Sequence, residues 1–246
     1  MNMNLKPFEF AKPANRPFLY TSFVSTIDGK IIVKEKGYWP IGTENDKEMF
    51  TYLRAHADAI VDAKNTALRF GKYFIRRIHE DMYQGFRREL GKTGMPEYIV
   101  LTSSPDEELA RVLKNEHNFR PTVLTTAEGE QVRETCNVKR VSSEENDGRV
   151  STQTFINYLN EQGHKIVFVD GGPTLIAQLL QDKVLDEIHL TITPKIFGST
   201  PGKTLTMVEG ILFPPDKVPQ FELVSVEKLD DEVVLRYQTP VGLTNP

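Results

Sequence analysis

Short runs of apolar residues alternate along the chain with longer stretches in which apolar side chains recur at helical spacing. The clearest run, residues 166–169, is continuously apolar, as expected for a strand buried on both faces of a sheet. Gly171 and Gly172 follow it, and apolar residues then recur with a helical period over residues 175–180. Because Pro173 suits the first turn of a helix, the pattern predicts a strand, an abrupt turn and a helix in immediate succession.

The same pattern extends over the rest of the chain. Strands are expected at residues 18–24, 30–33, 59–61, 98–102, 122–125, 138–141 and 166–169, at a further stretch before Gly198, and in a C-terminal hairpin of residues 221–229 and 232–239. Helices are expected after a cap at Thr43, over residues 72–86, after a cap at Ser104 with Pro105 in the first turn, over residues 152–162 with Gly163 as terminator, and after Gly172. The alternation predicts an α/β fold of three layers, with a mainly parallel central sheet, helices on both of its faces and the antiparallel hairpin at one edge.

Composition and charge narrow the class of protein. With 246 residues, 39% of them hydrophobic, and a formal net charge of -4, the chain can bury a full core but lacks the basic excess typical of nucleic-acid binding. Cys136 is the only cysteine and the five histidines form no closely spaced pair, so neither a disulfide nor a metal site is expected. The sequence has neither a run of about 18 apolar residues nor a signal-peptide pattern. We therefore expect a cytoplasmic protein that binds neither membrane nor nucleic acid.

Polar residues follow the predicted strands at the edge of the sheet where ligands bind in such folds. They are Thr26, Asp28 and Gly29; Asp62, Ala63, Asn65 and Thr66; Thr102, Ser103 and Ser104; and Asp170, Gly171, Gly172 and Thr174. The set contains no Ser-His-Asp grouping and no phosphate-binding lysine loop, so it suits a phosphorylated cofactor held against a polar substrate better than nucleophilic catalysis. A helix start after two glycines favours a phosphate, although a tight turn alone also explains Gly171 and Gly172.

Four sequence motifs, in order over about residues 17–238, resemble the reductase family of riboflavin biosynthesis. They are TSFVSTIDGKI, LRAHADAIVDAKNTALR, RRELGK and VDGGPTLIAQLLQDKVLDEIHLTITPKIFG. The family comprises the C-terminal domain of bacterial RibD and its stand-alone relatives, and no zinc-deaminase motif accompanies it here. The resemblance implies a dihydrofolate-reductase-like fold, with an N-terminal arm at 1–16 and a single reductase domain at 17–246. It also implies a homodimer that uses NADPH to reduce the ribosyl group of a pyrimidine ribosylamino 5′-phosphate to a ribityl group.

The resemblance further implies roles for residues near the start of the chain. Asp28 would be the catalytic residue, orienting the substrate or assisting proton delivery, while Thr26 and Gly29 of the same turn would contact the cofactor. The alternative is a structural turn in which the Asp28 carboxylate binds backbone amides. Ile41 would contact the cofactor and Trp39 the substrate from a loop over the active site, although Trp39 also suits an edge of the core.

The remaining cofactor contacts are expected at helix starts and a strand end. Thr66 would bond a cofactor phosphate or simply cap its helix. Ser103 follows the strand where the family holds the adenosine 2′-phosphate, and its neighbour Ser104 suits helix capping. The loop that would cradle the pyrophosphate through backbone N–H groups comprises Gly171, Gly172, Pro173, Thr174 and Leu175.

On the substrate side, the resemblance implies that Asp170 bonds the pyrimidine or the ribose. The candidates for a cation that binds the substrate phosphate are Arg54, Lys30 and Arg69, of which Arg54 is assigned to the substrate. This chain departs from the family pattern at Asp170, where glutamate is more usual, and at Ala63 and Asn65, which replace two glycines. These departures leave two alternatives open. One is a reductase of the same fold that acts on another small heterocycle or carbonyl compound, and the other is a catalytically silent nucleotide-binding protein.

Overall fold

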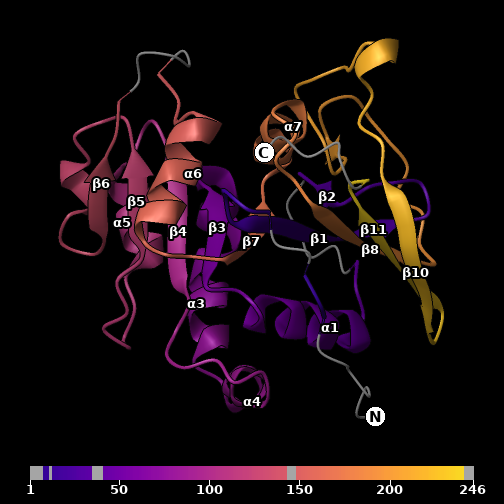
Figure 1. The fold of residues 1–246 in the computed structure, drawn as a ribbon, viewed down its shortest axis with the longest axis horizontal. Coiled ribbons are helices and arrows are strands. Elements are labelled where there is room, and N and C mark those ends of the chain that lie inside the picture. Colours follow the sequence, from indigo (N-terminus) through magenta and orange to yellow (C-terminus); the bar gives the residue numbers. More distant parts are fainter. Residues whose placement is uncertain (1–7, 11–12, 35–40, 143–147, 241–246) are drawn as a thin grey trace. The chain divides into compact units, whose positions relative to one another are not determined.

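The computed structural model describes residues 8–10, 13–34, 41–142 and 148–240 (Figure 1). The chain divides into two compact units. Unit 1 comprises the described parts of residues 1–10, 19–53 and 173–246, and unit 2 those of residues 11–18 and 54–172. No helix in these described ranges is both long enough and apolar enough to cross a lipid bilayer.

Unit 2 contains five strands that pair in parallel. Its strands, in spatial order, are β7 (Ile166–Gly171), β3 (Ala59–Ala63), β4 (Glu97–Thr102), β5 (Thr122–Thr125) and β6 (Asn137–Arg140). Val61 lies opposite Ile99 on one side and Val169 on the other, and all three side chains are fully buried. The central strands therefore read as continuous apolar runs because both of their faces are covered.

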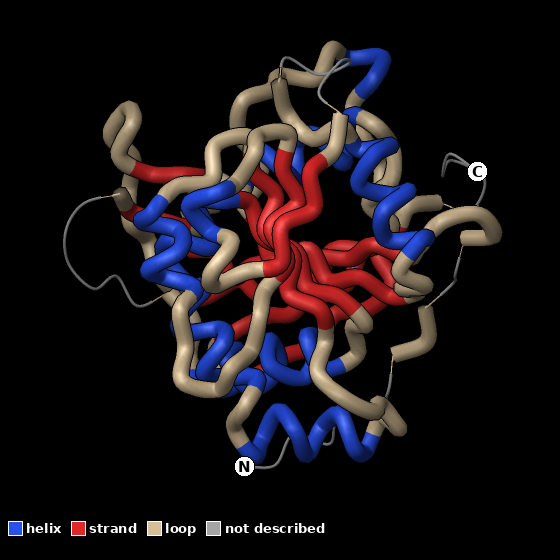
Figure 2. The backbone as a smooth tube through the Cα atoms, turned by 90° about the vertical axis from the view of Figure 1, so that its left-hand side faces the viewer, coloured by secondary structure: helices blue, strands red, loops and turns tan. Residues whose placement is uncertain are grey.

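Helices cover both faces of this sheet. They are α3 (Lys72–Ile78), α4 (Asp81–Glu89), α5 (Glu107–Leu113) and α6 (Thr152–Glu161), and the 3₁₀ turn η2 (Glu130–Val132) lies between β5 and β6. Successive side chains of a strand point to opposite faces. Glu97 of β4 accepts a hydrogen bond from Tyr158 of α6, and its neighbour Tyr98 packs against Phe74 of α3 with ring centroids 4.5 Å apart. Helices α6 and α3 therefore lie on opposite faces, and Figure 2 shows helices on either side of the strands.

The segment after β3 differs from the expected single helix at residues 72–86. Helical structure begins directly after the strand, at α2 (Lys64–Thr66), continues through a π-helical turn η1 (Ala67–Gly71) into α3, and is interrupted before α4. The π turn brings Gly71 against β4, where an added Cβ would lie 3.1 Å from the Tyr98 hydroxyl and 3.2 Å from a methyl group of Leu113. A side chain at position 71 would therefore force Tyr98 and Leu113 to shift.

The start of α5 differs from the prediction, whereas the end of α6 agrees with it. The predicted cap at Ser104 is wrong, because α5 begins after Asp106, whose carboxylate accepts a hydrogen bond of 3.0 Å from the Leu109 N–H. Lys64 holds this loop by donating to both the Ser104 carbonyl and the Asp106 carboxylate. Helix α6 ends as predicted, with Gly163 in the left-handed region at φ 76°.

Unit 1 contains a second group of strands with one antiparallel end. In spatial order they are β10 (Glu222–Leu229), β11 (Glu232–Gln238), β8 (Glu187–Thr193) and β1 (Phe18–Thr26). Strand β8 is parallel to β1 and antiparallel to β11, and β10 and β11 form the hairpin predicted around Asp230 and Asp231. The mainly parallel arrangement with a C-terminal antiparallel hairpin is thereby confirmed.

The other elements of unit 1 are short. They are β2 (Ile32–Val33), which pairs with β9 (Thr204–Leu205), the helices α1 (Glu44–Ala55, within unit 1 to Leu53) and α7 (Pro173–Gln181), and the 3₁₀ turn η3 (Pro215–Lys217). Thr43 caps α1 as predicted, since its hydroxyl accepts from the Asp46 N–H and donates to Glu232 of the hairpin at 2.6 Å. In the described part of the N-terminal arm, Phe8 and Phe10 pack against Tyr52 and Tyr20 respectively.

Candidate active site

The polar residues expected at the strand ends form two clusters, one in each unit. The cluster in unit 2 centres on Asp170, at the end of β7. Arg54 donates a short hydrogen bond to its carboxylate, and the two side chains are 11% and 7% exposed respectively. The Arg54 guanidinium also lies over the rings of Phe74 and Phe168, at 5.2 Å and 6.0 Å from their centroids. Arg54 is therefore held so that it fixes the orientation of Asp170.

A second carboxyl group, that of Asp62 in β3, belongs to the same cluster. It is 1% exposed, and the Tyr98 hydroxyl donates to its Oδ2 at 2.6 Å. Burial, followed by the neighbouring charge of Asp170, raises the pKa of Asp62 well above its ordinary value. Burial also raises the pKa of Asp170, but there the Arg54 guanidinium opposes the rise.

The two glycines after Asp170 form the turn expected to cradle a pyrophosphate. Strand β7 ends at Gly171, which has φ 140°, the peptide bond between Gly171 and Gly172 is cis, and helix α7 begins at Pro173. A Cβ added at Gly172 would lie 3.0 Å from the Thr66 hydroxyl oxygen, and one at Gly171 would lie 3.6 Å from it. The Thr66 hydroxyl caps no helical N–H, so the capping alternative for this residue is not realised. A side chain at position 172 would crowd the Thr66 hydroxyl, and the positive φ of Gly171 favours glycine, so backbone and hydroxyl lie together without intervening side-chain atoms. This arrangement fits a cofactor phosphate.

The strand end after β4 carries Ser103, which is exposed. Lys64 reaches the same loop, at 2.6 Å from the Ser104 carbonyl oxygen and 2.5 Å from the Asp106 carboxylate. Its ammonium group therefore lies at the loop where the resemblance implies a 2′-phosphate contact. Sequence reasoning missed Lys64 because it follows β3 and reaches the loop after β4 only in the folded chain.

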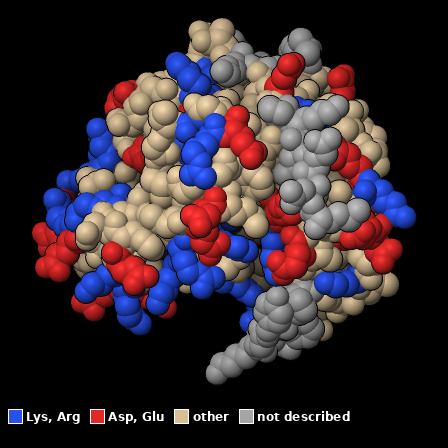
Figure 3. Space-filling view, turned by 90° about the horizontal axis from the view of Figure 1, so that it is seen from below, with Lys and Arg blue, Asp and Glu red and all other residues tan. Residues whose placement is uncertain are grey.

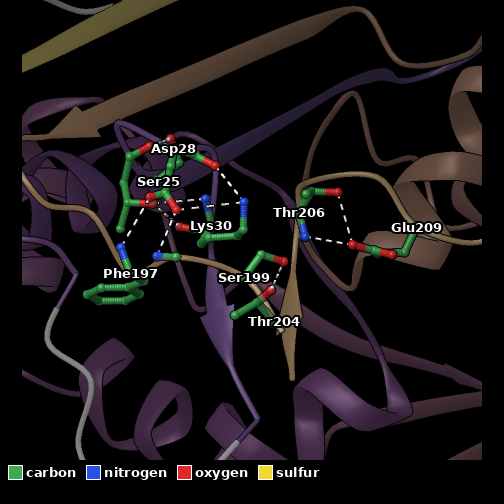
Figure 4. Close-up of polar contacts among 10 residues, drawn as sticks. Ser25, Asp28, Lys30, Phe197, Ser199, Thr204, Thr206 and Glu209 are labelled. Carbon is green, nitrogen blue, oxygen red and sulfur yellow. Dashed lines mark hydrogen bonds and ion pairs between the residues drawn. The ribbon is translucent and has the colours of Figure 1, made fainter. Parts of the chain in front are cut away.

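The cluster in unit 1 centres on Asp28, shown in Figure 4. Its carboxylate accepts hydrogen bonds from the Thr26 hydroxyl at 2.6 Å, and from the N–H groups of Phe197 and Gly198 at 3.2 Å and 2.9 Å. Gly29 takes a positive φ of 74° and donates to the Thr26 carbonyl, which closes the turn. The Asp28 carboxylate thus binds two backbone amides of the loop after β8, a contact of the kind that the structural alternative expects.

The contacts of Asp28 determine its protonation. The hydrogen bond from Thr26, together with those from Phe197 and Gly198, lowers the pKa of Asp28 below its ordinary value. At neutral pH the side chain is consequently an ionised acceptor. An ionised carboxylate can orient a ligand by accepting a hydrogen bond from it, which is one of the two roles expected for Asp28.

The other polar groups in this view belong to neighbouring loops. Lys30 donates to the Asp28 main-chain oxygen at 2.7 Å, while the Thr206 N–H and hydroxyl both donate to Glu209 (Figure 4). Ile41 is buried, and its carbonyl accepts from Lys195 at 2.5 Å. The predicted substrate contact at Trp39 lies outside the described residues.

We expect the substitution Asp28→Asn to loosen the loop that carries Phe197 and Gly198. The two N–H groups donate to different oxygens of the carboxylate, and asparagine has only one acceptor oxygen, so one hydrogen bond is lost and the other becomes a neutral one of roughly half the strength. The amide protons of both residues should therefore exchange several-fold faster. The pKa of Asp28 is lowered in the folded protein. The difference in exchange rate between D28N and wild type should therefore be present above the ordinary aspartate pKa and disappear as the pH falls through the folded pKa of Asp28. Amide exchange measured by NMR tests this, with the exposed Asp231→Asn as control. Equal protection in wild type and D28N would contradict the clamp.

The three cations considered for a substrate phosphate have different surroundings. Arg54 is committed to Asp170, Lys30 binds the Asp28 turn, and Arg69 is exposed with its guanidinium 5.4 Å from the Phe70 ring centroid. Over the face drawn in Figure 3, basic and acidic side chains are interspersed. On helix α3, Arg76 and Arg77 both pair with Glu80.

The chain resembles known reductases over most of its length. It is 29% identical over 200 residues to the 2,5-diamino-6-ribosylamino-4(3H)-pyrimidinone 5′-phosphate reductase of Archaeoglobus fulgidus, which covers 80% of this chain and 89% of that protein. It is 25% identical over 225 residues to the protein of the same name from Methanothermobacter thermautotrophicus, which covers 90% of this chain and 98% of that protein.

Solved structures share the fold at lower identity. RibD of Acinetobacter baumannii superposes with a TM-score of 0.68 at 17% identity, covering 92% of this chain, which spans 58% of that protein's length. The riboflavin biosynthesis reductase Rib7 of Saccharomyces cerevisiae superposes with a TM-score of 0.60 at 17% identity, covering 93% of this chain and 92% of that one. The family described as the RibD C-terminal domain matches residues 17–235, so the chain belongs to the RibD C-terminal domain family.

Proposed function

We propose that this protein reduces 2,5-diamino-6-ribosylamino-4(3H)-pyrimidinone 5′-phosphate, converting its ribosyl group to a ribityl group. The observation that carries the proposal is the similarity to two reductases of this name over 89% and 98% of their lengths. The buried Asp170–Arg54 pair and the open turn at Gly171 and Gly172 support it, because they offer a fixed acceptor and a phosphate cradle at the end of one strand.

The cofactor proposed is NADPH, which would supply the hydride when bound. Thr66, Gly171 and Gly172 would hold its phosphates, because the Thr66 hydroxyl caps no helical N–H and a side chain at position 172 would crowd it. The first turn of α7, with Pro173, Thr174 and Leu175, follows directly in the chain. Ser103 with Lys64 would contact the 2′-phosphate, and Lys64 supplies the cation that NADPH requires and NADH does not.

Asp170 is proposed as the substrate acceptor. Its carboxylate lies at a strand end and is oriented by Arg54, so it can accept hydrogen bonds from the amino and ring N–H groups of a diaminopyrimidinone. Arg54 would act on the substrate indirectly, by orienting the Asp170 carboxylate, since its guanidinium is buried with that carboxylate. Asp28 as the catalytic residue, with Thr26, Gly29, Trp39 and Ile41 beside the ligands, stays a prediction. So do the single domain at 17–246, the homodimer and the cytoplasmic location.

Purified protein incubated with this substrate and NADPH is expected to oxidise the cofactor and release the ribitylamino product. The absorbance of the reduced nicotinamide gives the rate, and mass spectrometry of the product shows a gain of two hydrogens. NADH in place of NADPH should raise KM, because a 2′-phosphate contact is lost. Absence of turnover with both cofactors would exclude the proposed activity.

A reductase of the same fold with another small substrate is the second candidate. Asp170, in place of the usual glutamate, favours it, because the shorter side chain sets the acceptor about one methylene farther from a ligand. A panel of heterocycles and carbonyl compounds assayed with NADPH, including the deaminated uracil analogue, separates the two. Cofactor binding without turnover on any member would instead indicate a silent nucleotide-binding protein.

A further inference from the structure

The carboxyl group of Asp62 lies in the strand next to the one that carries Asp170, the proposed substrate acceptor. Strand β3 pairs with β7 so that Asp62 is opposite Gly171, the residue after Asp170. Asp62 is 1% exposed and follows the fully buried Val61. A potentially charged side chain therefore stands at the end of an apolar strand, next to a second carboxyl group.

The hydrogen bonds of Asp62 are incomplete for a charged carboxylate. Tyr98 donates to Oδ2, while Oδ1 is buried and has no partner among the described residues. An ionised carboxylate has about four acceptor positions, and burying it with most of them empty is costly. A neutral carboxylic acid loses far less, because it carries no net charge into the interior.

The charged and titratable groups that act on Asp62 come from three elements. They are Tyr98 of β4, Asp170 of β7 and Arg54 of α1. Tyr98 is itself buried and its pKa is raised, first by burial and then by Asp62, so it remains a neutral donor. Arg54 makes its ion pair with Asp170. Two carboxyl groups thus share the field of one guanidinium, and that guanidinium is bonded to only one of them.

We propose that Asp62 is held as a neutral carboxylic acid and acts as a positioning residue, leaving Asp170 as the one carboxylate beside Arg54. The cluster then carries one positive and one negative charge, and Asp170 is free to accept from an uncharged, donor-rich heterocycle. If Asp62 were ionised, the surplus charge would compete for Arg54 and repel a phosphorylated ligand. The protonation state of Asp62 does not depend on the proposed reductase function. Its role toward the substrate rests on that function.

Infrared spectroscopy of the ligand-free protein tests the protonation directly. With ¹³C-labelled aspartate, wild-type protein at pH 7 should show the carbonyl stretch of a protonated carboxylic acid, and Asp62→Asn should lack it. Tyr98→Phe removes the hydrogen bond to Oδ2 and should shift the band without abolishing it, which identifies Asp62 even if D62N folds poorly. Absence of the band from wild type overturns the proposal.

The pH dependence of unfolding provides a second test. Above the ordinary aspartate pKa of about 3.9 the unfolded chain loses a proton that the folded chain keeps, so stability falls as pH rises toward the folded pKa. The unfolding equilibrium constant of wild type, divided by that of D62N, should therefore rise by up to about tenfold per pH unit over this window. A ratio that does not change with pH, or that falls as pH rises, overturns the proposal.

Asp58, which precedes the same strand, is the matched control. Burial acts to raise the pKa of Asp58, but the hydrogen bonds from Lys92, Lys165 and Ile166 outweigh it and the pKa is lowered. Its contribution to stability is present above the ordinary pKa and is lost as the pH falls. The unfolding equilibrium constant of wild type, divided by that of Asp58→Asn, should therefore fall as the pH rises through the range below the ordinary aspartate pKa. This opposite slope shows that the assay distinguishes a raised pKa from a lowered one.

The role toward substrate is tested on the active enzyme. In wild type kcat/KM should fall at alkaline pH as Asp62 loses its proton, and this fall should be absent from D62N and retained in D58N. Identical alkaline profiles in wild type and D62N, together with the infrared band, would reject the positioning role while leaving the buried acid. An inactive wild type would refute the reductase function and leave the infrared and unfolding results unaffected.

Discussion

Replacing Gly172 with alanine is expected to weaken binding of the reduced cofactor by about a hundredfold or more. The added Cβ would lie 3.0 Å from the Thr66 hydroxyl oxygen, in the space where the proposed phosphate cradle is open. Loss of one or two hydrogen bonds to a charged group, at about 1.5–3 kcal/mol each, gives a change of this size. Fluorescence titration with NADPH measures it.

Two variants separate loss of the cradle from simple misfolding. In Gly172→Ala combined with Thr66→Ala the contact with the hydroxyl is gone, so the fold should recover while binding stays weak. Gly85→Ala in helix α4, where the nearest atom to an added Cβ is 3.9 Å away, should bind like wild type. If G172A bound NADPH with unchanged affinity, the phosphates would have to lie elsewhere.

Replacing Arg54 with methionine is expected to destabilise the protein by about 3–5 kcal/mol. The change removes one partner of a buried ion pair and leaves Asp170 without its cation, beside a second buried carboxyl group. At low pH the Asp170 carboxyl is protonated in the variant, so the loss should shrink as the pH falls. Urea unfolding at several pH values measures both effects.

The matched double variant Arg54→Met with Asp170→Asn should regain most of the loss, because no unpaired charge then stays buried. Arg88→Met, at an exposed position of α4, should change stability by no more than about 0.5 kcal/mol. A small loss for R54M that equals the loss for R88M would show that the Asp170 pair contributes little to the fold.

Most strands could be predicted from the sequence because parallel strands covered on both faces must be apolar throughout. The run at residues 166–169 has this apolar pattern, whereas the antiparallel hairpin is marked by its turn at Asp230, and both lie where expected. The helical stretch after β3 was predicted poorly. It includes a π-helical turn, whose spacing differs from the 3.6-residue period, and its helix α3 stops at Ile78 before the predicted end.

The candidate site was predictable only where its chemistry is local in sequence. Gly171 and Gly172 at the end of β7 are recognisable in the sequence, and so is the turn around Asp28. The bond between Tyr98 and Asp62 joins residues 36 positions apart, and the one between Arg54 and Asp170 joins residues 116 apart. Such pairs are set by strand order and helix packing, so neither the buried acid nor the partner of Arg54 could be read from composition or spacing.

The division into units has a consequence for how the chain matures. Most of unit 2 is one continuous stretch, residues 54–172, whereas unit 1 draws its last segment from residue 173 onward. Leu19, in β1, binds Asp186 across a separation of 167 residues. During synthesis on the ribosome the five-stranded parallel sheet can therefore assemble while β1 still waits for β8 to emerge. The nascent protein would pass through a stage in which the glycine turn exists before the Asp28 loop has its partners.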